Sequence, residues 1–260
     1  MKMSGRTVLI TGGSSGIGLE LARQLLAGGN TVIVTGRDQA RLDSARQRLP
    51  QVHTIQSDAR DPLSIQQLFS AVSSQFPALD TLVNNAGVMR NIKLYAARSL
   101  EDLTDEIEVN LNAPMRMVQQ FLPFLLTRPN SMIINVSSGL AFVPFPAAPI
   151  YSAAKAALHA YSQCLRAQLR GSNVSVIEIA PPGTETPLLR AEFANEMKNE
   201  KGMDPVLMVR QCIRQIEAGQ LEVCPGLSKV LKVASRVAPG LIFKQMIRLS
   251  GLKPVASQGQ

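Results

Sequence analysis

The sequence has few of the residues that build metal or disulfide sites. Its 260 residues include three cysteines, two histidines and no tryptophan. Cys164, Cys212 and Cys224 are odd in number and show neither CxxC nor metal-ligand spacing, so we expect reduced, buried thiols. His53 and His159 stand alone in the sequence, whereas a zinc site needs several ligands together. We therefore predict no metal site.

Long apolar runs are also missing. No run approaches the roughly 20 apolar residues that a membrane-spanning helix requires. The first residues show neither the apolar core nor the cleavage site of a signal peptide. These two features lead us to expect a cytoplasmic protein.

Acidic residues are absent from the end of the chain. The formal net charge is +8, and no Asp or Glu follows Glu222. Most of the positive excess lies in this last segment, on Lys229, Lys232, Arg236, Lys244, Arg248 and Lys253. Because aromatic residues make up only 4% of the chain, this segment has few groups with which to read a nucleic acid. We expect no nucleic-acid partner.

Short β-branched runs alternate with longer helical patterns from residue 7 to about residue 180. Strands are predicted at residues 7–10, 31–35, 53–56, 81–83, 132–136, 174–179 and 221–223, and helices at residues 16–27, 39–49, 62–76, 100–126 and 150–169. Alternation of this kind indicates right-handed βαβ units and a parallel sheet that is covered on both faces. The sequence therefore predicts an α/β fold: a doubly wound, Rossmann-type, three-layer α/β/α domain spanning residues 1–260.

The segment after about residue 184 differs from the rest. Residues 187–219 are helical and polar in pattern, and residues 229–250 mix apolar and basic side chains. We interpret residues 187–260 as a substrate lid followed by a basic, helical C-terminal appendage. The appendage is expected to pack on its own protein or on a second subunit, and contact with an anionic membrane surface is the alternative.

A glycine-rich turn follows the first predicted strand. It reads Thr-Gly-Gly-Ser-Ser-Gly-Ile-Gly over residues 11–18 and opens a predicted helix. Glycines at these places permit a tight turn, close approach to a pyrophosphate, and close packing of helix on sheet, while the helix N-terminus offers free N–H groups. A loop that merely needs flexibility is the alternative. We expect the turn to bind a dinucleotide through Gly12, Ser14, Ser15, Gly16, Ile17 and Gly18.

Residues after the second and third strands bear on which dinucleotide binds. An arginine there attracts the 2′-phosphate of NADP, whereas an acidic residue favours the free ribose of NAD. Arg37 follows the second strand and favours NADP, although Asp38 is adjacent and Arg37 could equally be a solvated surface charge. Asp58 follows the third strand and is expected to accept a hydrogen bond from the adenine amino group; a turn or helix-entry residue is the alternative.

Tyr151 and Lys155 lie one helical turn apart on the same face of a predicted helix, thirteen residues after Ser138. A free tyrosine has a pKa of about 10. We expect the Lys155 ammonium, together with an oxidised nicotinamide, to lower the pKa of Tyr151 and make it an acid or base near neutral pH. A tyrosine and a lysine at this spacing also occur by accident on many helices, and Ser138 with the glycine turn makes the catalytic interpretation the stronger one.

These ordered motifs resemble the short-chain dehydrogenases/reductases over about residues 5–190. They are the turn at residues 11–18, Asn-Asn-Ala-Gly at residues 84–87, Asn110, Ser138, and Tyr151 with Lys155. The resemblance implies that Tyr151 is the acid/base, that Lys155 activates it and binds the nicotinamide ribose, that Ser138 binds the substrate oxygen and that Asn110 anchors a water. It also implies cofactor contacts at Asn85, Ala86 and Gly87, and a homodimer or homotetramer.

The chain departs from the family pattern after the sixth strand. Pro181 takes the usual proline place, but Pro182 stands where glycine is expected, which stiffens the backbone. The resemblance still implies that Pro181, Thr184 and Thr186 contact the nicotinamide. The double proline, residues 135–144 and residues 236–240 are together similar to the DltE-type bacterial oxidoreductases. Nothing in these residues recognises alanine or a polymer, so no such role is transferred.

Apolar residues between Ser138 and Tyr151, at positions 140 and 142–146, are expected to border the substrate, or else simply to form core. We therefore expect an oxidoreductase that transfers a hydride between NADP(H), or less favourably NAD(H), and a carbonyl or alcohol group of a small, largely apolar molecule. A dinucleotide-binding sensor or scaffold with little turnover is the alternative function.

Overall fold

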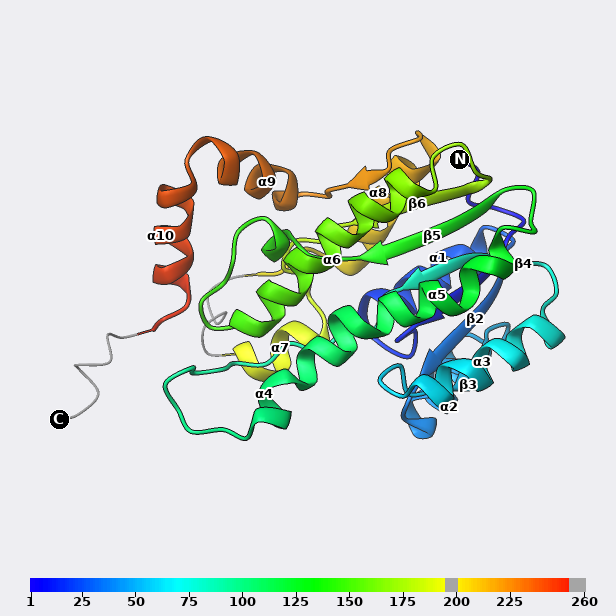
Figure 1. Ribbon diagram of the computed structural model, residues 1–260, viewed down its shortest axis with the longest axis horizontal. Helices are drawn as coiled ribbons and strands as arrows, with labels where there is room; N and C mark the ends of the chain where they lie inside the picture. The colour runs from blue at the N-terminus through cyan, green and yellow to red at the C-terminus, as the bar shows by residue number, and fades with distance from the viewer. Residues whose placement is uncertain (195–200, 253–260) are drawn as a thin grey trace.

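Seven parallel strands form one sheet in the computed structural model, which describes residues 1–194 and 201–252 (Figure 1). The strands are β1 (Thr7–Thr11), β2 (Thr31–Gly36), β3 (His53–Gln56), β4 (Leu79–Asn84), β5 (Ser131–Val136), β6 (Val174–Ile179) and β7 (Glu222–Val223). Their order across the sheet is β3-β2-β1-β4-β5-β6-β7. The order reverses direction at β1, and the chain leaves β1 toward one face of the sheet, with α1, and β4 toward the other, with α5, which is where ligands bind in folds of this kind.

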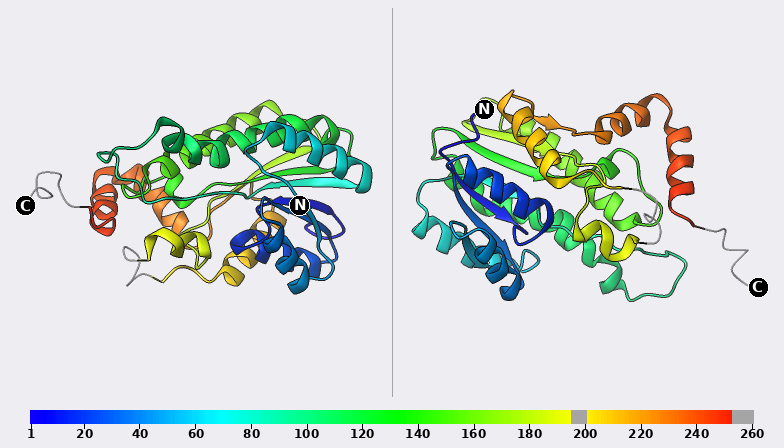
Figure 2. Two further views of the ribbon diagram at one scale, coloured as in Figure 1. Left: turned by 90° about the horizontal axis from the view of Figure 1, so that it is seen from below. Right: turned by 180° about the vertical axis from the view of Figure 1, so that it is seen from behind.

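Helices cover both faces of the sheet, as Figure 2 shows. On one face lie α1 (Gly16–Ala27), α2 (Gln39–Arg48) and α8 (Pro205–Glu217), and on the other α3 (Pro62–Gln75), α5 (Ala113–Leu125) and α6 (Pro149–Gln168). Each face has its own apolar core, centred on Ile10 and Leu25 in one case and on Leu9 and Phe121 in the other. The expected three-layer α/β/α domain is confirmed.

The strands near the middle of the sheet are apolar on both faces because both faces are covered. All five residues of β1 and all six of β5 are buried. Polar residues mark where helices begin: the Asp38 carboxylate accepts a hydrogen bond from the Arg41 N–H before α2, and Asp61 caps α3 ahead of Pro62.

The helix expected over residues 100–126 is present over residues 100–125, but a π-helical turn interrupts its α-helical geometry. The structure has α4 (Leu100–Ile107), a π-helical turn η1 (Glu108–Asn112) and then α5. Two residues explain the interruption. Pro114 has no N–H to donate to the carbonyl of Asn110, and the Asn110 side-chain amide itself donates to the Glu106 carbonyl at 2.9 Å. The wide turn is thus built around a residue of the expected site.

The chain after β6 forms α7 (Pro187–Phe193), then α8 on the face of the sheet that carries α1, and after β7 the helices α9 (Leu227–Val237) and α10 (Pro239–Leu249). In Figure 1, α9 and α10 form an L at the side of the molecule where the sheet ends. Lys253 and residues 195–200, which belong to the expected lid and appendage, lie outside the described residues. Among the helices that are described, none has the length and apolar character to cross a bilayer.

The cysteines are only partly as expected. All three are free thiols, but Cys164 on α6 is exposed and Cys224 is half-buried. Cys212 alone is fully buried, on the inner face of α8. The prediction of buried thiols is therefore wrong for Cys164, because that residue lies on the solvent side of an amphipathic helix whose inner face carries Leu158 and Leu165.

Candidate active site

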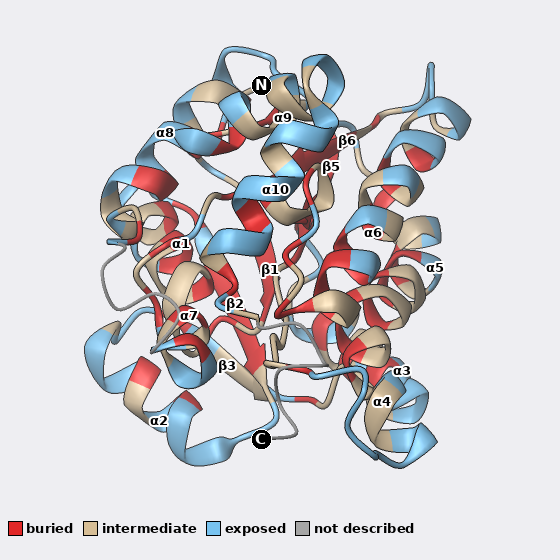
Figure 3. Cartoon of the chain, turned by 90° about the vertical axis from the view of Figure 1, so that its left-hand side faces the viewer, coloured by how far each residue is buried: buried red, intermediate tan, exposed pale blue. Residues whose placement is uncertain are grey.

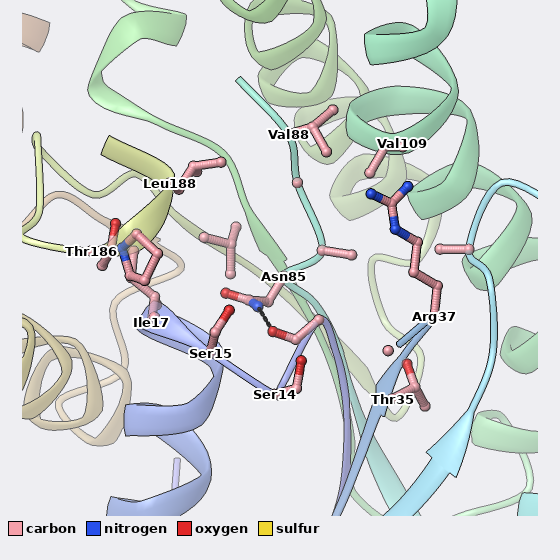
Figure 4. Close-up of a pocket in the computed structure, with 18 of the residues that line it drawn as sticks. Ser14, Ser15, Ile17, Thr35, Arg37, Asn85, Val88, Val109, Thr186 and Leu188 are labelled. Atoms are coloured by element: carbon pink, nitrogen blue, oxygen red, sulfur yellow. Dashed lines mark hydrogen bonds between the residues drawn. The ribbon is translucent and has the colours of Figure 1, made fainter. Parts of the chain in front are cut away.

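A cleft of about 310 Å³ opens at the carboxyl ends of β1, β2, β3 and β4. Most of the expected site residues line it: Gly12, Ser14, Ser15, Gly16, Ile17, Arg37, Asp58, Asn85, Ala86, Gly87, Tyr151, Lys155, Pro181 and Thr186. Figure 4 shows Arg37 at one end of this cleft and Thr186 and Leu188 at the other. Gly18, Asn110, Ser138 and Thr184 lie behind the lining.

The glycine turn lines the floor of the cleft, and Gly12 and Gly18 show why glycine is needed there. Gly12 has φ +64°, and a Cβ on it would stand 2.8 Å from the Ala86 Cα. A Cβ on Gly18 would stand 2.5 Å from the Gly12 carbonyl oxygen, so Gly18 serves the close packing of α1. Ser15 precedes α1 without capping it through its side chain, which leaves N–H groups at the helix start for an anion. This geometry fits a pyrophosphate.

Thr11 ties the glycine turn to the segment after β4, a role that the sequence did not single out. Its hydroxyl oxygen accepts hydrogen bonds from the N–H of Asn85 at 3.0 Å and of Ala86 at 3.1 Å. The Asn85 side-chain amide donates in return to the carbonyls of Thr11 at 2.9 Å and Gly12 at 3.1 Å. Figure 4 marks one hydrogen bond of this amide with a dashed line. Asn85 therefore acts through its side chain on the backbone of the turn, and it holds two walls of the cleft together.

Three arginines line the end of the cleft at β2 and β3: Arg37, Arg41 and Arg60. Arg41 and Arg60 were missed by sequence reasoning, because one follows a helix start and the other lies in a loop after β3. The Asp58 carboxylate faces Arg60, with Oδ2 2.7 Å from Nη2, and this hydrogen bond lowers the pKa of Asp58. Asp38 is occupied as the cap of α2. Asp38 also pairs with Arg41 over 3.5 Å, and Arg60 pairs with Asp105 over 3.3 Å, so two of the three arginines are held by aspartates.

Tyr151 and Lys155 both project from α6 into the cleft, and both are nearly fully buried. Burial raises the pKa of Tyr151 to about 12, a hydrogen bond with Ser138 opposes the rise, and the charge of Glu106 adds to it. The expected lowering is therefore wrong for the chain alone. The main reason is burial of the phenol; in addition, the Lys155 Nζ lies 5.6 Å from the centre of the tyrosine ring and donates its hydrogen bond to the Val136 carbonyl.

Lys155 donates from Nζ to the Val136 carbonyl at the end of β5, over 2.9 Å. Burial lowers its pKa to about 8. The ammonium also faces Gly87, where an added Cβ would come within 3.7 Å of Nζ and 3.0 Å of the Asn110 Oδ1. Gly87 thus leaves space between the lysine and the asparagine.

Asn110 and Ser138 stand directly behind the cleft. The Asn110 amide donates to the Val88 carbonyl at 2.7 Å, and its Oδ1 accepts from the Val88 N–H at 3.3 Å, so the side chain fixes the strand end that borders the cleft. Ser138 follows β5, and its hydroxyl accepts from the Leu140 N–H at 3.1 Å. Thr184 is turned away from the cleft: its hydroxyl donates to the Pro182 carbonyl at 2.9 Å.

An apolar cluster surrounds Tyr151 on the side away from the glycine turn. It contains Val143, Phe145, Ala147 and Ala148 from the segment before α6, Phe193 from α7, and Met246 from α10, with Met89, Leu140 and Phe142 at its edge. The expected apolar wall at residues 140–146 is thus partly core, as Val143 and Phe145 are buried. Phe193 and Met246, which come from far along the chain, were not identified from the sequence.

Glu106 is a further residue that sequence reasoning missed. Its side chain is fully buried, and its Oε1 accepts from the Arg90 N–H at 2.9 Å. Burial raises the pKa of this carboxyl group, and Glu106 in turn raises the pKa of Tyr151. A glutamate in the middle of a helix gives no sequence signal of this kind, because charged residues usually face solvent.

Comparison with known proteins gives consistent results. The family model for short chain dehydrogenases matches residues 6–197. The chain is 41% identical over 249 residues to the uncharacterized oxidoreductase DltE of Bacillus subtilis, covering 95% of this chain and 98% of that protein. It is 33% identical over 193 residues to the NADP-dependent 3-hydroxy acid dehydrogenase YdfG of Salmonella typhi, covering 73% of this chain and 78% of that protein.

A solved structure agrees with the fold. A short chain dehydrogenase from Burkholderia cenocepacia, in complex with NADP, superimposes with a TM-score of 0.81 at 25% identity. The match covers 98% of this chain and all of that one. The narrower similarity to DltE-type oxidoreductases is confirmed by the match over nearly the full length of both chains.

Proposed function

The chain belongs to the short-chain dehydrogenase family and is an NAD(P)-dependent oxidoreductase, and from this premise we propose that it interconverts a carbonyl and an alcohol group on a small, largely apolar molecule. NADP is the proposed nucleotide, and Tyr151 is the proposed acid/base. The observation that carries the proposal is that Tyr151 and Lys155 line the same cleft as the glycine turn. When bound, the nucleotide supplies or accepts the hydride.

Tyr151 is suited to give a proton to a substrate oxygen. With a pKa of about 12, its phenol is protonated at neutral pH, so it can donate to the oxygen of a carbonyl group that gains a hydride at carbon. Ser138 shares a hydrogen bond with this phenol and would bind the same oxygen. In the reductive direction, one hydride and one proton are added across the C=O bond, and an alcohol forms.

Lys155 and Asn110 support this step from behind. A lysine with a pKa of about 8 is mostly an ammonium at neutral pH and places a positive charge near the phenol. Asn110 keeps the segment after β4 in place through its two bonds to Val88. The space that Gly87 leaves between Lys155 and Asn110 suits the water that the family resemblance assigns to Asn110.

Two features support the choice of nucleotide and substrate. Arg37, Arg41 and Arg60 line the cleft end where a ribose 2′-phosphate would lie, and an arginine fork suits that anion. The apolar cluster around Tyr151, with Phe145 and Phe193 in it, suits an apolar substrate body. The homodimer or homotetramer expected from the family stays a prediction, which light scattering would test.

Consumption of NADPH against a panel of aldehydes, ketones and quinones tests the proposal. We expect Tyr151→Phe to lose turnover by at least about a hundredfold while it keeps its affinity for NADPH, because only the acid is removed. Tyr161→Phe is the matched control, since Tyr161 lies on the same helix and packs in the other core. Equal rates in Tyr151→Phe and the native chain would remove Tyr151 from the mechanism. Tight NADPH binding with no turnover of any substrate would favour the sensor or scaffold.

A further inference from the structure

The helices α9 and α10 form a C-terminal arm, residues 227–249, with an unusual outer surface. Seven of the fourteen large apolar residues that are exposed in the described part of the chain belong to it. They are Leu227, Val230, Val233, Val237, Leu241, Phe243 and Ile247, and between 40% and 79% of each is exposed. Scattered apolar residues on a surface are normal, but such a concentration marks an interaction site.

On α9 these residues form one stripe. Leu227, Val230, Val233 and Val237 are three, three and four positions apart, which places them on one side of a helix. The buried Ser228 and the half-buried Leu231 lie on the inner side, toward the protein. The apolar stripe therefore points away from the molecule and is not needed to hold α9 in place.

On α10 the inner and outer sides also differ. Met246 is buried, and Ile242 and Leu249 pack with it in the cluster around Tyr151. Phe243 and Ile247, one turn apart, are exposed on the other side. Figure 3 shows the exposed faces of α9 and α10 together at the side of the molecule from which the arm projects.

Cations accompany the apolar stripe. Lys229 and Arg236 on α9 and Lys244 and Arg248 on α10 are exposed. No acidic residue follows Glu222, and Glu222 itself forms an ion pair with Lys232. The outer surface of the arm thus combines apolar side chains with positive charges that have no acidic residue in the arm to neutralise them.

Neither residues 253–260 nor a two-fold contact between two arms suits that surface. Residues 253–260 contain one large apolar side chain, Val255, which is too little to cover the seven exposed apolar residues of the arm. In a two-fold contact between arms, each copy presents the same patch, so the cations of one copy would face those of the other. Juxtaposed like charges oppose such a contact. The positive charge favours an anionic partner, and the exposed apolar side chains favour a partner that has an apolar interior.

We propose that the C-terminal arm docks on the surface of a membrane that contains anionic lipids. Helices with apolar residues on one side and Lys or Arg beside them lie in the plane of such a surface, with the apolar side among the acyl chains and the cations at the headgroups. The arm is anchored to the body through Met246 and its neighbours, so docking requires no unfolding of the cluster around Tyr151. The proposal is independent of the substrate and of catalysis.

Sedimentation of the full chain with lipid vesicles tests the proposal. We expect at least tenfold more protein bound to vesicles of phosphatidylcholine with phosphatidylglycerol than to vesicles of phosphatidylcholine alone. The double variant Lys229→Glu, Arg236→Glu should bind the anionic vesicles at least tenfold more weakly, because two attractions become repulsions. Arg46→Glu, Arg48→Glu is the matched control, since these exposed arginines lie on α2, away from the arm. It should bind nearly as the native chain does.

A second pair of variants separates the apolar contribution from charge. Val237→Ser, Leu241→Ser leaves the charge unchanged and removes the two most exposed apolar side chains of the arm, at 79% and 73%. We expect severalfold weaker binding, and a larger effect at high salt, where the electrostatic part is screened. Leu63→Ser, Leu207→Ser, on the exposed sides of α3 and α8, is the control and should change nothing. Because all these side chains are exposed, each variant should melt near the native temperature.

Three results would overturn the proposal: no sedimentation of the native chain, equal binding to neutral and anionic vesicles, or equal loss in the arm variants and their controls. Light scattering on the same samples tests the main alternative, in which a second copy of this chain covers the arm. If the arm variants change the subunit number while the native chain fails to sediment, the arm is a contact between copies of this chain.

Discussion

The two halves of the cleft are formed by different kinds of chemical group. The half that would hold the nucleotide consists of backbone turns and polar side chains at the ends of β1, β2 and β3, all within residues 11–60, closed by Asn85. The half around Tyr151 consists of apolar side chains gathered from the loop before α6, from α7 and from α10. The first half depends on backbone geometry at a few positions, and the second on packing between distant segments.

Because of this difference, we expect substitutions in the two halves to affect different properties of the protein. A substitution in the nucleotide half should weaken nucleotide binding through a single steric clash, because the tightly packed glycines of the turn leave no room for a side chain. A change in the apolar half should act on stability and on substrate affinity together, because the same side chains do both. The four predictions below test that contrast, and their expected effects decrease in size.

The largest effect is expected for Gly12→Ala. The new Cβ would stand 2.8 Å from the Ala86 Cα, and φ at this position is +64°. We expect the affinity for NADPH to fall by about a hundredfold, and the free energy of unfolding by about 1–3 kcal/mol. Fluorescence titration with NADPH and urea unfolding measure the two quantities. Gly183→Ala is the control, since a Cβ there meets nothing within 4 Å; a Gly12→Ala chain that binds NADPH as tightly as this control would refute the rigid turn.

Met246→Ala probes the apolar half. Met246 is 8% exposed and connects α10 to the cluster around Tyr151. Its truncation should lower the free energy of unfolding by about 2 kcal/mol and the Tm by about 4–8 °C. The KM for an apolar substrate should rise while the Kd for NADPH stays unchanged. Gln245→Ala, the exposed neighbour on α10, should leave all these quantities unchanged. A weaker affinity for NADPH in Met246→Ala would show that the two halves are coupled.

More of the nucleotide half than of the apolar half could be predicted from the sequence, for physical reasons. Gly12, Gly16 and Gly18 lie within one turn, where local conformation and function coincide, so their pattern is readable without a structure. Phe193 and Met246 join Tyr151 only through the tertiary fold, and each has the sequence pattern of an ordinary helix residue. Periodicity cannot reveal which distant helix faces meet.

The structure differs from the sequence-based expectation in two other places, where local interactions outweigh the sequence pattern. The helical periodicity of residues 100–126 is real, but Pro114 and the Asn110 amide insert a π-turn that no periodicity records. The expected low pKa of Tyr151 rested on Lys155 and an oxidised nicotinamide; in the chain without nucleotide, burial dominates and raises the pKa to about 12. Tyr151 packs with Phe145, which belongs to the expected apolar segment, and with Phe193 and Met246, which were not predicted.

Arg37→Asp should have a smaller effect, confined to the nucleotide half. Replacing the cation by an acid should reduce the ratio of NADP to NAD affinity by about tenfold, because an ionic hydrogen bond to the 2′-phosphate is lost and a repulsion is added. Titration with both nucleotides measures the ratio. Arg46→Asp, in the last turn of α2, is the control for a change of net charge. An unchanged ratio in Arg37→Asp would indicate that Arg41 and Arg60, which line the same end of the cleft, select NADP instead.

The smallest effect is expected at the boundary of the two halves. His159 does not stand alone as its sequence suggested: its Nδ1 lies 2.7 Å from Oε2 of the buried Glu178. The Ser137 hydroxyl, at the end of β5 beside the cleft, donates to the other oxygen of Glu178. The hydrogen bond to Glu178 raises the pKa of His159 above its ordinary value of 6.5.

A histidine whose pKa is raised in the folded state stabilises that state fully below its unfolded pKa, and the contribution is lost as pH rises through the folded pKa. Urea unfolding of the native chain and of His159→Gln should therefore differ most below the unfolded pKa of about 6.5, by less than about 1 kcal/mol, and the difference should disappear as the pH rises through the folded pKa. His53→Gln is the control, because His53 is an exposed residue on β3. A difference that grows with pH would mean that His159 is held neutral, as an acceptor or a packing residue, and that the end of β5 is not supported by charge.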